Sequence, residues 1–517
     1  MNYKPLIAAI AAAIVLAPGS AFAFCGFYVG GGEDALVNDA TQVIMMREGE
    51  RTILSMRNDY KGPPEDFAMV VPVPVVLQEE HVKTLDPTVF TTIERMAAPR
   101  LVEYWEQDPC PPEYDPIDYA LEGAMDFGGV PKMSAAPTGG PPPSVVVEAQ
   151  FKVGEYEIVI LSATESGALD SWLREGGYNI PKGAGDVLRP YVEQGMYFFV
   201  AKVDASKVSF VDGRARLSPL RFHYDSKEFA LPIRLGMLNA DGAQDLIVHI
   251  LALGQRYEAA NYKNVTIPTN LGVTDDTRER FGEFYAALFD KTLERNPGAV
   301  VTEYAWQWPE FQNGPKCDPC PPGPSIGWGP LQALGADVTQ VGGQRWDYVL
   351  TRIHARYDKT TLGDDLVFRA AAPIVGGREH IVSANGELEE GSQPSGTNQF
   401  QGRYIIRHPW DGPIACDNPQ RGVWGGPPGG GSNVSAATDT ALAPRGGLEL
   451  VAHLRTPVPE LDIEAGALHS VGAQELTVPR GPEFHGCGAC STRQPTGMVW
   501  VALGLLALGG VLVRRRG

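Results

Sequence analysis

Residues 41–57, TQVIMMREGERTILSMR, indicate the fold class of this 517-residue chain. Two apolar-rich runs, residues 42–47 and 52–57, flank the short polar segment Glu48-Gly49-Glu50. Runs of this kind joined by a glycine-containing turn are typical of a β-hairpin. The sequence therefore predicts antiparallel sheet near the start of the chain.

Strand-like runs recur along the next three hundred residues. Each is rich in β-branched and aromatic residues, which favour extended structure. They cover residues 67–76, 145–152, 156–161, 197–203, 216–224, 229–235, 246–253, 300–308 and 348–357. Pro72 and Pro74 cannot donate a hydrogen bond to a neighbouring strand, so the first of these runs is predicted to be an edge strand or a strand exit.

Three segments carry helix signals. Asp86 and Pro87 are typical of a helix start, and apolar residues at helical spacing follow them up to Pro99. Residues 162–165, Ser-Ala-Thr-Glu, match a capping box. Residues 276–295 carry an apolar stripe that ends at Pro297-Gly298. Strands outnumber helices without regular alternation, which predicts an α+β fold, mainly antiparallel sheet with a few packed helices.

The N-terminus has the features of a secretory signal peptide. Lys4 precedes an apolar run at residues 6–16, and Ala21-Phe22-Ala23 fits the cleavage site for signal peptidase. Residues 1–23 are therefore predicted to be removed after Ala23. An uncleaved anchor is one alternative, and acylation of Cys25 is another, although the latter requires a small residue where Phe24 stands.

The C-terminal residues 487–517 combine Cys490, a polar spacer, an uncharged apolar run at residues 497–513 and three arginines, 514–516. As a helix the run would span about 26 Å, which is just enough to cross the hydrocarbon core of a membrane. A buried core helix would explain the apolar run but not the arginines, which are typical of a cytoplasmic end. We therefore expect a transmembrane helix here.

This tail resembles the myxobacterial C-terminal sorting signal (MYXO-CTERM). The resemblance implies that a C-terminal sorting protease cuts the tail and that the protein reaches the cell surface. Cys487 and Cys490 both fit the cysteine of the signal, and we favour Cys490 because it lies nearer the apolar run.

The region between the predicted strands and the tail changes in composition. Residues 371–486 contain the tract WGGPPGGGS at 424–432, and glycine-rich and proline-rich tracts are typical of linkers. We interpret residues 24–370 as a globular exported domain and residues 371–486 as a loosely packed stalk. Residues 127–144 are predicted to be a long loop within the domain.

The chain is acidic, with a formal net charge of −19 that becomes −23 once Lys4 and the three terminal arginines are removed with the two ends. An acidic body without a basic stripe argues against nucleic acid as a partner. Hydrophobic residues make up 44% of the chain, which is enough for an ordinary globular core.

Seven cysteines are present, and an exported protein is expected to pair them as disulfides. If one tail cysteine serves in anchoring, six remain, and six cysteines allow 15 pairings that the sequence alone does not distinguish. The disulfide candidates in the body are Cys25, Cys110, Cys317, Cys320 and Cys416.

Several short patterns suggest chemistry but lack the structural context it requires. In a redox dithiol, the two cysteines lie at the start of a helix. The prolines that follow Cys317-Asp318-Pro319-Cys320 do not fit a helix, so a structural role for these two cysteines is the better interpretation. Ser325 lies in a G-x-S-x-G match without a strand before it or a helix after it. Cys487, Cys490 and His485 suggest half of a zinc site, and the two C-x-x-C pairs together could supply four cysteines, but the tail pair belongs to the C-terminal segment described above.

The remaining polar candidates have ordinary structural interpretations. His223, His249 and His354 lie in strand-like runs, where a structural histidine is the usual case. The acid pairs Glu65-Asp66 and Asp364-Asp365 are interpreted as solvated loop carboxylates. We therefore assign no catalytic residue, cofactor or metal ligand.

The body resembles a bacterial family, the domain of unknown function 2330. The resemblance rests on four stretches and covers about residues 24–371. They are Cys25-Gly26, residues 66–74 (DFAMVVPVP), residues 351–354 (TRIH) and residues 364–368 (DDLVF). It implies one continuous exported domain, and it implies no reaction, ligand or catalytic residue.

The sequence leaves two classes of function open. The first, which we favour, is an exported, cell-surface-anchored protein with a structural or binding role and an unknown ligand. The alternative is an exported enzyme, either a hydrolase or a thiol oxidoreductase. A cleft with converging histidine and carboxylate groups would favour the enzyme, and a closed core with paired cysteines would favour the structural or binding protein.

Overall fold

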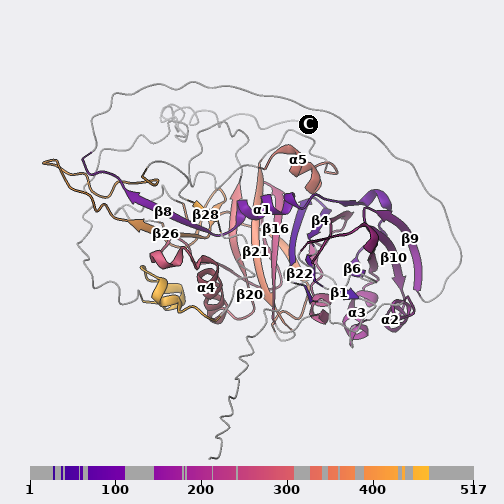
Figure 1. Ribbon diagram of the computed structural model, residues 1–517. Helices are drawn as coiled ribbons and strands as arrows, with labels where there is room; N and C mark the ends of the chain where they lie inside the picture. The colour runs from indigo at the N-terminus through magenta and orange to yellow at the C-terminus, as the bar shows by residue number, and fades with distance from the viewer. Residues whose placement is uncertain are drawn as a thin grey trace, which may run out of the picture.

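The computed structural model describes about two thirds of the chain (Figure 1). The described residues are 27–29, 37–38, 41–57, 59–61, 68–110, 145–176, 180, 183–211, 214–239, 243–307, 326–339, 347–358, 361–378, 389–428, 434–436 and 446–464. The predicted signal peptide, the 127–144 loop and the C-terminal tail lie outside these residues. Within the described ranges, no helix combines the length and the apolar character needed to cross a membrane.

A large central sheet organises the body, and the predicted hairpin lies inside it. β3 (Thr41–Glu48) and β4 (Arg51–Arg57) pair antiparallel, with Glu48 opposite Arg51, as predicted. The strand order is β24 (Gln393–Pro394), β23 (Ile374–Gly376), β25 (Gln399–Gln401), β20 (Ala299–Gln307), β21 (Tyr348–Tyr357), β16 (Gln244–Leu253), β3, β4, β14 (Leu220–Asp225) and β7 (Val82–Thr84), and β18 (Lys263–Thr266) also pairs with β20.

A five-stranded sheet packs face to face on part of the central sheet. Its order is β1 (Phe27–Val29), β6 (Ala68–Val73), β11 (Tyr197–Val203), β10 (Tyr156–Ala163) and β9 (Val145–Val153). Alternate residues of both sheets, such as Met45, Met69 and Phe199, share one buried core. The outer face is covered by α2 (Ser166–Glu175) and α3 (Ala184–Glu193), at the lower right of Figure 1.

The prolines of β6 lie where the sequence places them. β6 pairs with β11 along residues 68–73, whereas β1 pairs only with residues 68–70. Beyond residue 70, no described strand pairs with β6 on the side of β1, so the missing N–H of Pro72 costs no described hydrogen bond there. This arrangement confirms the predicted strand exit.

Two long helices, α1 (Thr88–Ala97) and α4 (Phe281–Arg295), cover the opposite face of the central sheet, and the short helices α5 (Trp328–Leu331) and η5 (Gln332–Ala336) pack in the same core as α1. Ile44 and Met46 alternate with Val43 and Met45 along β3, and the first pair packs under α1. α4 covers the neighbouring part of the same face over β20. Figure 1 shows α1 in front of the central strands and α4 beside β20. The predicted helix is present, but it begins one residue later than the sequence indicates, at Thr88 with Pro87 as the N-cap. Asp86 Oδ1 still accepts hydrogen bonds from Thr88 N and Oγ1 at 2.8 and 2.7 Å.

A further sheet, at the left of Figure 1, is built on two parallel strands from distant parts of the chain. β8 (Arg100–Glu106) pairs with β26 (Arg403–His408) along its whole length. The sheet is completed by β19 (Leu271–Gly272), β27 (Trp424–Gly425) and β28 (Val434–Ala436). Two smaller sheets contain β15 (Ala230–Leu231), β22 (Leu366–Ala371) and β17 (Arg256–Ala259), and β12 (Ser209–Val211), β13 (Arg214–Arg216), β5 (Asp59–Lys61) and β2 (Val37–Asn38).

The interpretation of residues 371–486 as a loosely packed stalk does not hold for the described parts of that stretch. Phe400, Tyr404 and Ile406 are buried in the core beneath α4. Two short helices, η7 (Leu450–His453) and η8 (Pro459–Leu461), contribute further residues to the same core. The glycine and proline content predicted a linker because it is a local signal, whereas this segment owes its order to pairing with β8 and β20.

Two other expectations need correction. Residues 162–165 do not form a capping box, since β10 runs to Ala163 and the helix begins at Ser166. The mixed α+β class is confirmed, but the sheets are less antiparallel than predicted. Five strand pairs are parallel among the described residues: β3 with β16, β8 with β26, β18 with β20, β19 with β26 and β23 with β25.

Gly377→Ala should lower the free energy of unfolding by about 2 kcal/mol or more, because the residue has φ +69° and a Cβ would lie 2.1 Å from the carbonyl oxygen of Gln401. Urea denaturation of the purified protein measures this change. Gly363→Ala is the matched control, since no atom lies within 4 Å of its Cβ position. Equal stability of the two variants would show that residues 374–378 are not held against β25.

Candidate functional site

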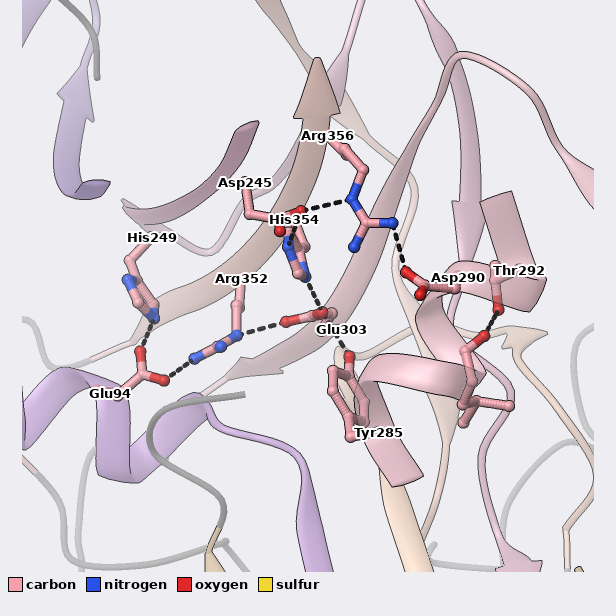
Figure 2. Close-up of polar contacts among 11 residues, drawn as sticks. Glu94, Asp245, His249, Tyr285, Asp290, Thr292, Glu303, Arg352, His354 and Arg356 are labelled. Carbon is pink, nitrogen blue, oxygen red and sulfur yellow. Dashed lines mark hydrogen bonds and ion pairs between the residues drawn. The ribbon is translucent and has the colours of Figure 1, made fainter. Parts of the chain in front are cut away.

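The most unusual feature of the described core is a chain of charged side chains between the central sheet and its two covering helices. We call it the buried charge cluster; its members are Glu94, Asp245, Asp290, Glu303, Arg352, His354 and Arg356 (Figure 2). Because side chains alternate along a strand, Arg352, His354 and Arg356 of β21 all point to the helix-covered face. Residues 352–356, Arg-Ile-His-Ala-Arg, thus place three polar groups in an interior layer.

Arg352 lies at the inner end of the cluster and joins the sheet to α1. It is 0% exposed. Its Nε donates to Oε2 of Glu303 at 2.5 Å, and its Nη1 lies 2.6 Å from Oε1 of Glu94 on α1. Glu94 also lies 3.5 Å from Nε2 of His249. Arg352 therefore pairs with two carboxylates, one from the sheet and one from α1, and a buried charge requires such a partner.

His354 lies between two carboxylates. Its Nδ1 is 2.7 Å from Oε1 of Glu303, and its Nε2 is 3.1 Å from Oδ1 of Asp245. The ring stacks on Phe289 of α4, with the ring centroids 3.7 Å apart. A neutral imidazole has only one N–H. Its second ring nitrogen is an acceptor and would then face a carboxylate oxygen, which is also an acceptor. The group of His354, Asp245 and Glu303 must therefore hold one more proton than a neutral ring with two carboxylates.

Arg356 connects the cluster to the surface. Its Nε donates to Oδ1 of Asp245 at 2.9 Å, and its Nη1 donates to Asp290 on α4. The guanidinium also lies over the ring of Phe289, 4.9 Å from the centroid. The Asp290 side chain is 35% exposed, so the cluster runs from solvent to the interior without a gap.

Burial and charge act against each other on the pKa values of the cluster. Burial alone would raise the pKa of Glu303, but the positive charges and hydrogen bonds of His354, Arg352 and Tyr285 outweigh it and bring the pKa to about 2. Burial lowers the pKa of His354, and Glu303 opposes this effect. The pKa of His249 is lowered well below its ordinary value by burial and by the charge of Arg352.

The geometry of the cluster supports a structural role. Glu303, Arg352, His354 and Asp245 are each at most 2% exposed, so a substrate cannot reach their polar atoms in this conformation. Among the described residues near the cluster, the question of a serine nucleophile concerns Ser55 of β4 and His249 of β16. The two residues lie on the same row of the sheet, but β3 lies between them. Two strand spacings separate them by about 9.5 Å, too far for a serine nucleophile and its base. The charges of the cluster instead pair with one another and connect β16, β20 and β21 to α1 and α4.

The structure joins two of the predicted disulfide cysteines. Cys110 and Cys416 form a disulfide across 306 residues, with their Cα atoms 5.7 Å apart. The remaining cysteines and the processing residue lie outside the described residues: Ala23, Cys25, Cys317, Cys320, Cys487 and Cys490. Within the described ranges, no group of three or more His, Cys, Asp or Glu side chains has an arrangement that could hold a metal ion.

The other polar candidates have separate surroundings. His223 contacts the edge of His81, and burial followed by the charge of His81 lowers its pKa to about 4. Asp364 is exposed and pairs with Arg234. Ser325 and the pair Glu65-Asp66 lie outside the described residues.

Asp365 is not the solvated loop carboxylate that the sequence suggests. It accepts hydrogen bonds from Tyr191 Oη at 2.7 Å and from the backbone N of Ile233 at 2.8 Å, and burial raises its pKa. The sequence places the two acids side by side, but only the fold brings Tyr191 to the second of them. Asp365 therefore acts as a structural acceptor.

The sequence points to His249 and His354 but does not reveal their partners. The signal that could have found them was the pattern Arg-x-His-x-Arg in an otherwise apolar strand, with a single Glu303 in a second apolar strand. A polar residue at an inward-facing strand position requires a partner, because unpaired buried charge is costly. The identity of that partner depends on which strands and helices become neighbours.

Glu303→Gln should destabilise the protein by about 3–5 kcal/mol, because it leaves Arg352 without one of its two buried carboxylates. It should also reduce the loss of stability in acid. Because the folded pKa of Glu303 is about 2, below the ordinary 4.5, its contribution is complete above pH 4.5 and disappears as the pH falls toward 2.

Denaturant titrations of the wild type and of Glu303→Gln between pH 6 and pH 2.5 measure this effect. The control is Glu294→Gln, which changes an exposed carboxylate paired with Lys291. If Glu303→Gln retained the acid sensitivity of the wild type, another group would be responsible for it.

Comparison with known proteins places the chain in a family. A family model described as "Uncharacterized protein conserved in bacteria (DUF2330)" matches residues 19–369. These residues include α1, α4, every member of the buried charge cluster and the central sheet apart from its strands β23, β24 and β25. No curated protein and no solved structure matches the chain. Because the match covers more than half of the sequence, the chain belongs to this bacterial family, DUF2330.

Proposed function

We propose that this protein is exported and held at the cell surface by its C-terminus, where it has a structural or binding role. The observation that carries the proposal is the disulfide between Cys110 and Cys416. Disulfides form and persist in oxidising compartments outside the cytoplasm. The signal peptide and the sorting-like tail predicted from the sequence agree with such a location.

The surroundings of the disulfide support a structural use. Cys110 follows β8, and its backbone N donates to Oδ1 of Asp108 at 2.9 Å. Close to the disulfide, Arg421 donates two hydrogen bonds of 2.8 Å to Glu106 of β8. The disulfide therefore joins the end of β8 to the segment that follows β26, next to an ion pair that connects the same two parts of the chain.

The buried charge cluster favours a structural or binding role over catalysis. Its central groups are enclosed, and their hydrogen bonds connect the elements of the fold rather than converge on an open space. A fold by itself does not define an activity, but the enclosed acid and base groups of this cluster support a structural or binding role in addition to the disulfide.

Cys110→Ser combined with Cys416→Ser should lower the free energy of unfolding by about 2–5 kcal/mol, because the disulfide restricts a very long loop in the unfolded chain. Urea denaturation measures the change. In the wild type under oxidising conditions, thiol titration after unfolding should find neither cysteine free. Two reactive thiols at these positions in protein isolated from cells would argue against export to an oxidising compartment.

Processing at both ends provides the second test. Intact-mass analysis of the native protein should show Phe24 as the first residue and loss of residues 497–517. Cys490→Ser should leave the tail uncut or release the protein from the membrane fraction, and Cys487→Ser is the matched control, three residues away. A native protein that retains Arg514 would mean that the tail is a permanent anchor instead.

The alternative of a thiol oxidoreductase predicts a different outcome. The wild-type protein would then reduce insulin in the presence of a dithiol, and replacement of Cys317 and Cys320 by serine would abolish the turnover. Under the structural or binding proposal, neither protein shows turnover above the dithiol alone.

A further inference from the structure

Two arginines on one face of β26 differ from the other arginines of the described core. Arg403 is 1% exposed, and the only hydrogen bond from its guanidinium to a described residue runs from Nη2 to Tyr104 Oη, at 3.1 Å. Its Nε and Nη1 are buried without a hydrogen-bond partner. Arg407, which is half-buried, forms neither a hydrogen bond nor an ion pair with any residue that the structure describes.

Other buried arginines in the described chain have either a carboxylate partner or several acceptors. Arg47, which is 9% exposed, donates to the backbone carbonyls of Glu50, Ser226 and Lys227. Arg352 pairs with Glu303, and Arg221, which is 1% exposed, lies 2.8 Å from Oδ1 of Asp337. An isolated charge in the protein interior is strongly unfavourable unless a counter-charge and hydrogen-bond acceptors accompany it. Among the described residues, Arg403 and Arg407 therefore have neither a carboxylate, as Arg352 and Arg221 have, nor a set of backbone acceptors, as Arg47 has.

Aromatic rings provide part of the compensation. The guanidinium of Arg403 lies 5.5 Å from the ring centroid of Tyr104, and that of Arg407 lies 5.3 Å from the ring centroid of Trp424. Such cation–π contacts contribute about 0.5–2 kcal/mol each. They do not accept the remaining N–H groups. Those of Arg403 are buried without an acceptor, so an anion would have to approach them past the half-buried Arg407.

The nearest carboxylates are occupied. Glu106, on the same face of β8 as Tyr104, accepts two hydrogen bonds from Arg421 and others from the backbone of Trp410 and Gly422. Glu103 alternates with Tyr104, so it points to the opposite face. There its carboxylate binds Arg278 and His408.

The two arginines lie close enough to influence each other. They flank Ile405 along β26, and Tyr104 lies directly opposite Arg407 in the parallel pair. Burial, followed by the positive charge of Arg403, lowers the pKa of Arg407. An anion bound between the two guanidinium groups would remove this repulsion and would face an apolar floor formed by Val102 and Ile405.

We infer that Arg403 and Arg407, with Tyr104 and Trp424, form a binding site for an oxyanion, that is, a carboxylate, sulfate or phosphate group. Guanidinium groups suit these anions because their N–H donors match oxygen pairs. The inference deepens the binding role proposed above by naming a ligand class, and it does not depend on export or on the C-terminal anchor.

Isothermal titration of the purified full-length protein tests the inference. The probes are sodium phosphate, sodium sulfate and sodium benzoate, the last presenting a carboxylate on a ring that can stack on Trp424. Sodium chloride holds the ionic strength constant. We expect at least one probe to bind saturably, and Arg407→Gln to weaken that binding by about tenfold or more. Preference for benzoate over phosphate and sulfate would assign the site to an organic acid rather than a free inorganic ion.

Two variants control the experiment. Arg369→Gln changes an exposed arginine of β22 that pairs with Glu258, and it should bind the probe as the wild type does. Arg407→Lys keeps the charge and should recover part of the affinity that Arg407→Gln loses, which distinguishes anion binding from a folding defect. Circular dichroism checks that each variant is folded.

The inference is overturned if no probe binds saturably to the wild type, or if Arg407→Gln and Arg369→Gln bind it equally. Either result would leave the processing and fractionation experiments on the two chain ends unaffected. Conversely, a protein that is neither exported nor anchored could still bind the anion.

Discussion

The buried carboxylate of Glu303 holds together the strands and helices of the central core. It accepts hydrogen bonds from Arg352 and Tyr285 and lies within hydrogen-bond distance of His354, so one side chain of β20 connects β21 and α4. Arg352 extends the connection to Glu94 on α1. A buried carboxylate is stable only when positive charge and donors surround it. The positions of both helices over the sheet are therefore tied to this single group.

Apolar packing supplies the larger part of the driving force, but it is less directional. The helix-covered face of the sheet contributes buried side chains to two separate cores, one under α1 and one under α4. The buried charge cluster lies between these two cores. Hydrophobic contacts alone tolerate many similar packings, whereas a satisfied polar network requires particular partners at particular distances. We infer that the cluster specifies how the two helices lie on the sheet.

The sheet around β8 and β26 shows the opposite situation. There the ring of Trp105 stacks on His408, Glu103 and Glu106 are fully occupied, and yet Arg403 retains donors without acceptors. Elsewhere in the described core, the buried guanidinium groups of Arg352 and Arg221 each lie within hydrogen-bond distance of a carboxylate, whereas Arg403 and Arg407 have no such partner among the described residues. This contrast between the two polar regions, rather than either region alone, separates the structural part of the molecule from the proposed oxyanion site.

The sequence by itself determined the local elements of this protein. The hairpin of residues 41–57, the strand of residues 348–357 and the helix that follows Asp86 follow from alternation and capping, which depend on neighbours a few residues away. Only the tertiary structure decided which charges meet, because Glu94, Asp245, Glu303 and Arg352 come from four elements spread over 258 residues. It also decided that residues 399–408 are core rather than stalk, since their order comes from pairing with β8 and β20. Local composition carries no information about such distant partners. For that reason the sequence could identify polar residues in apolar strands but could not predict which of them contact one another.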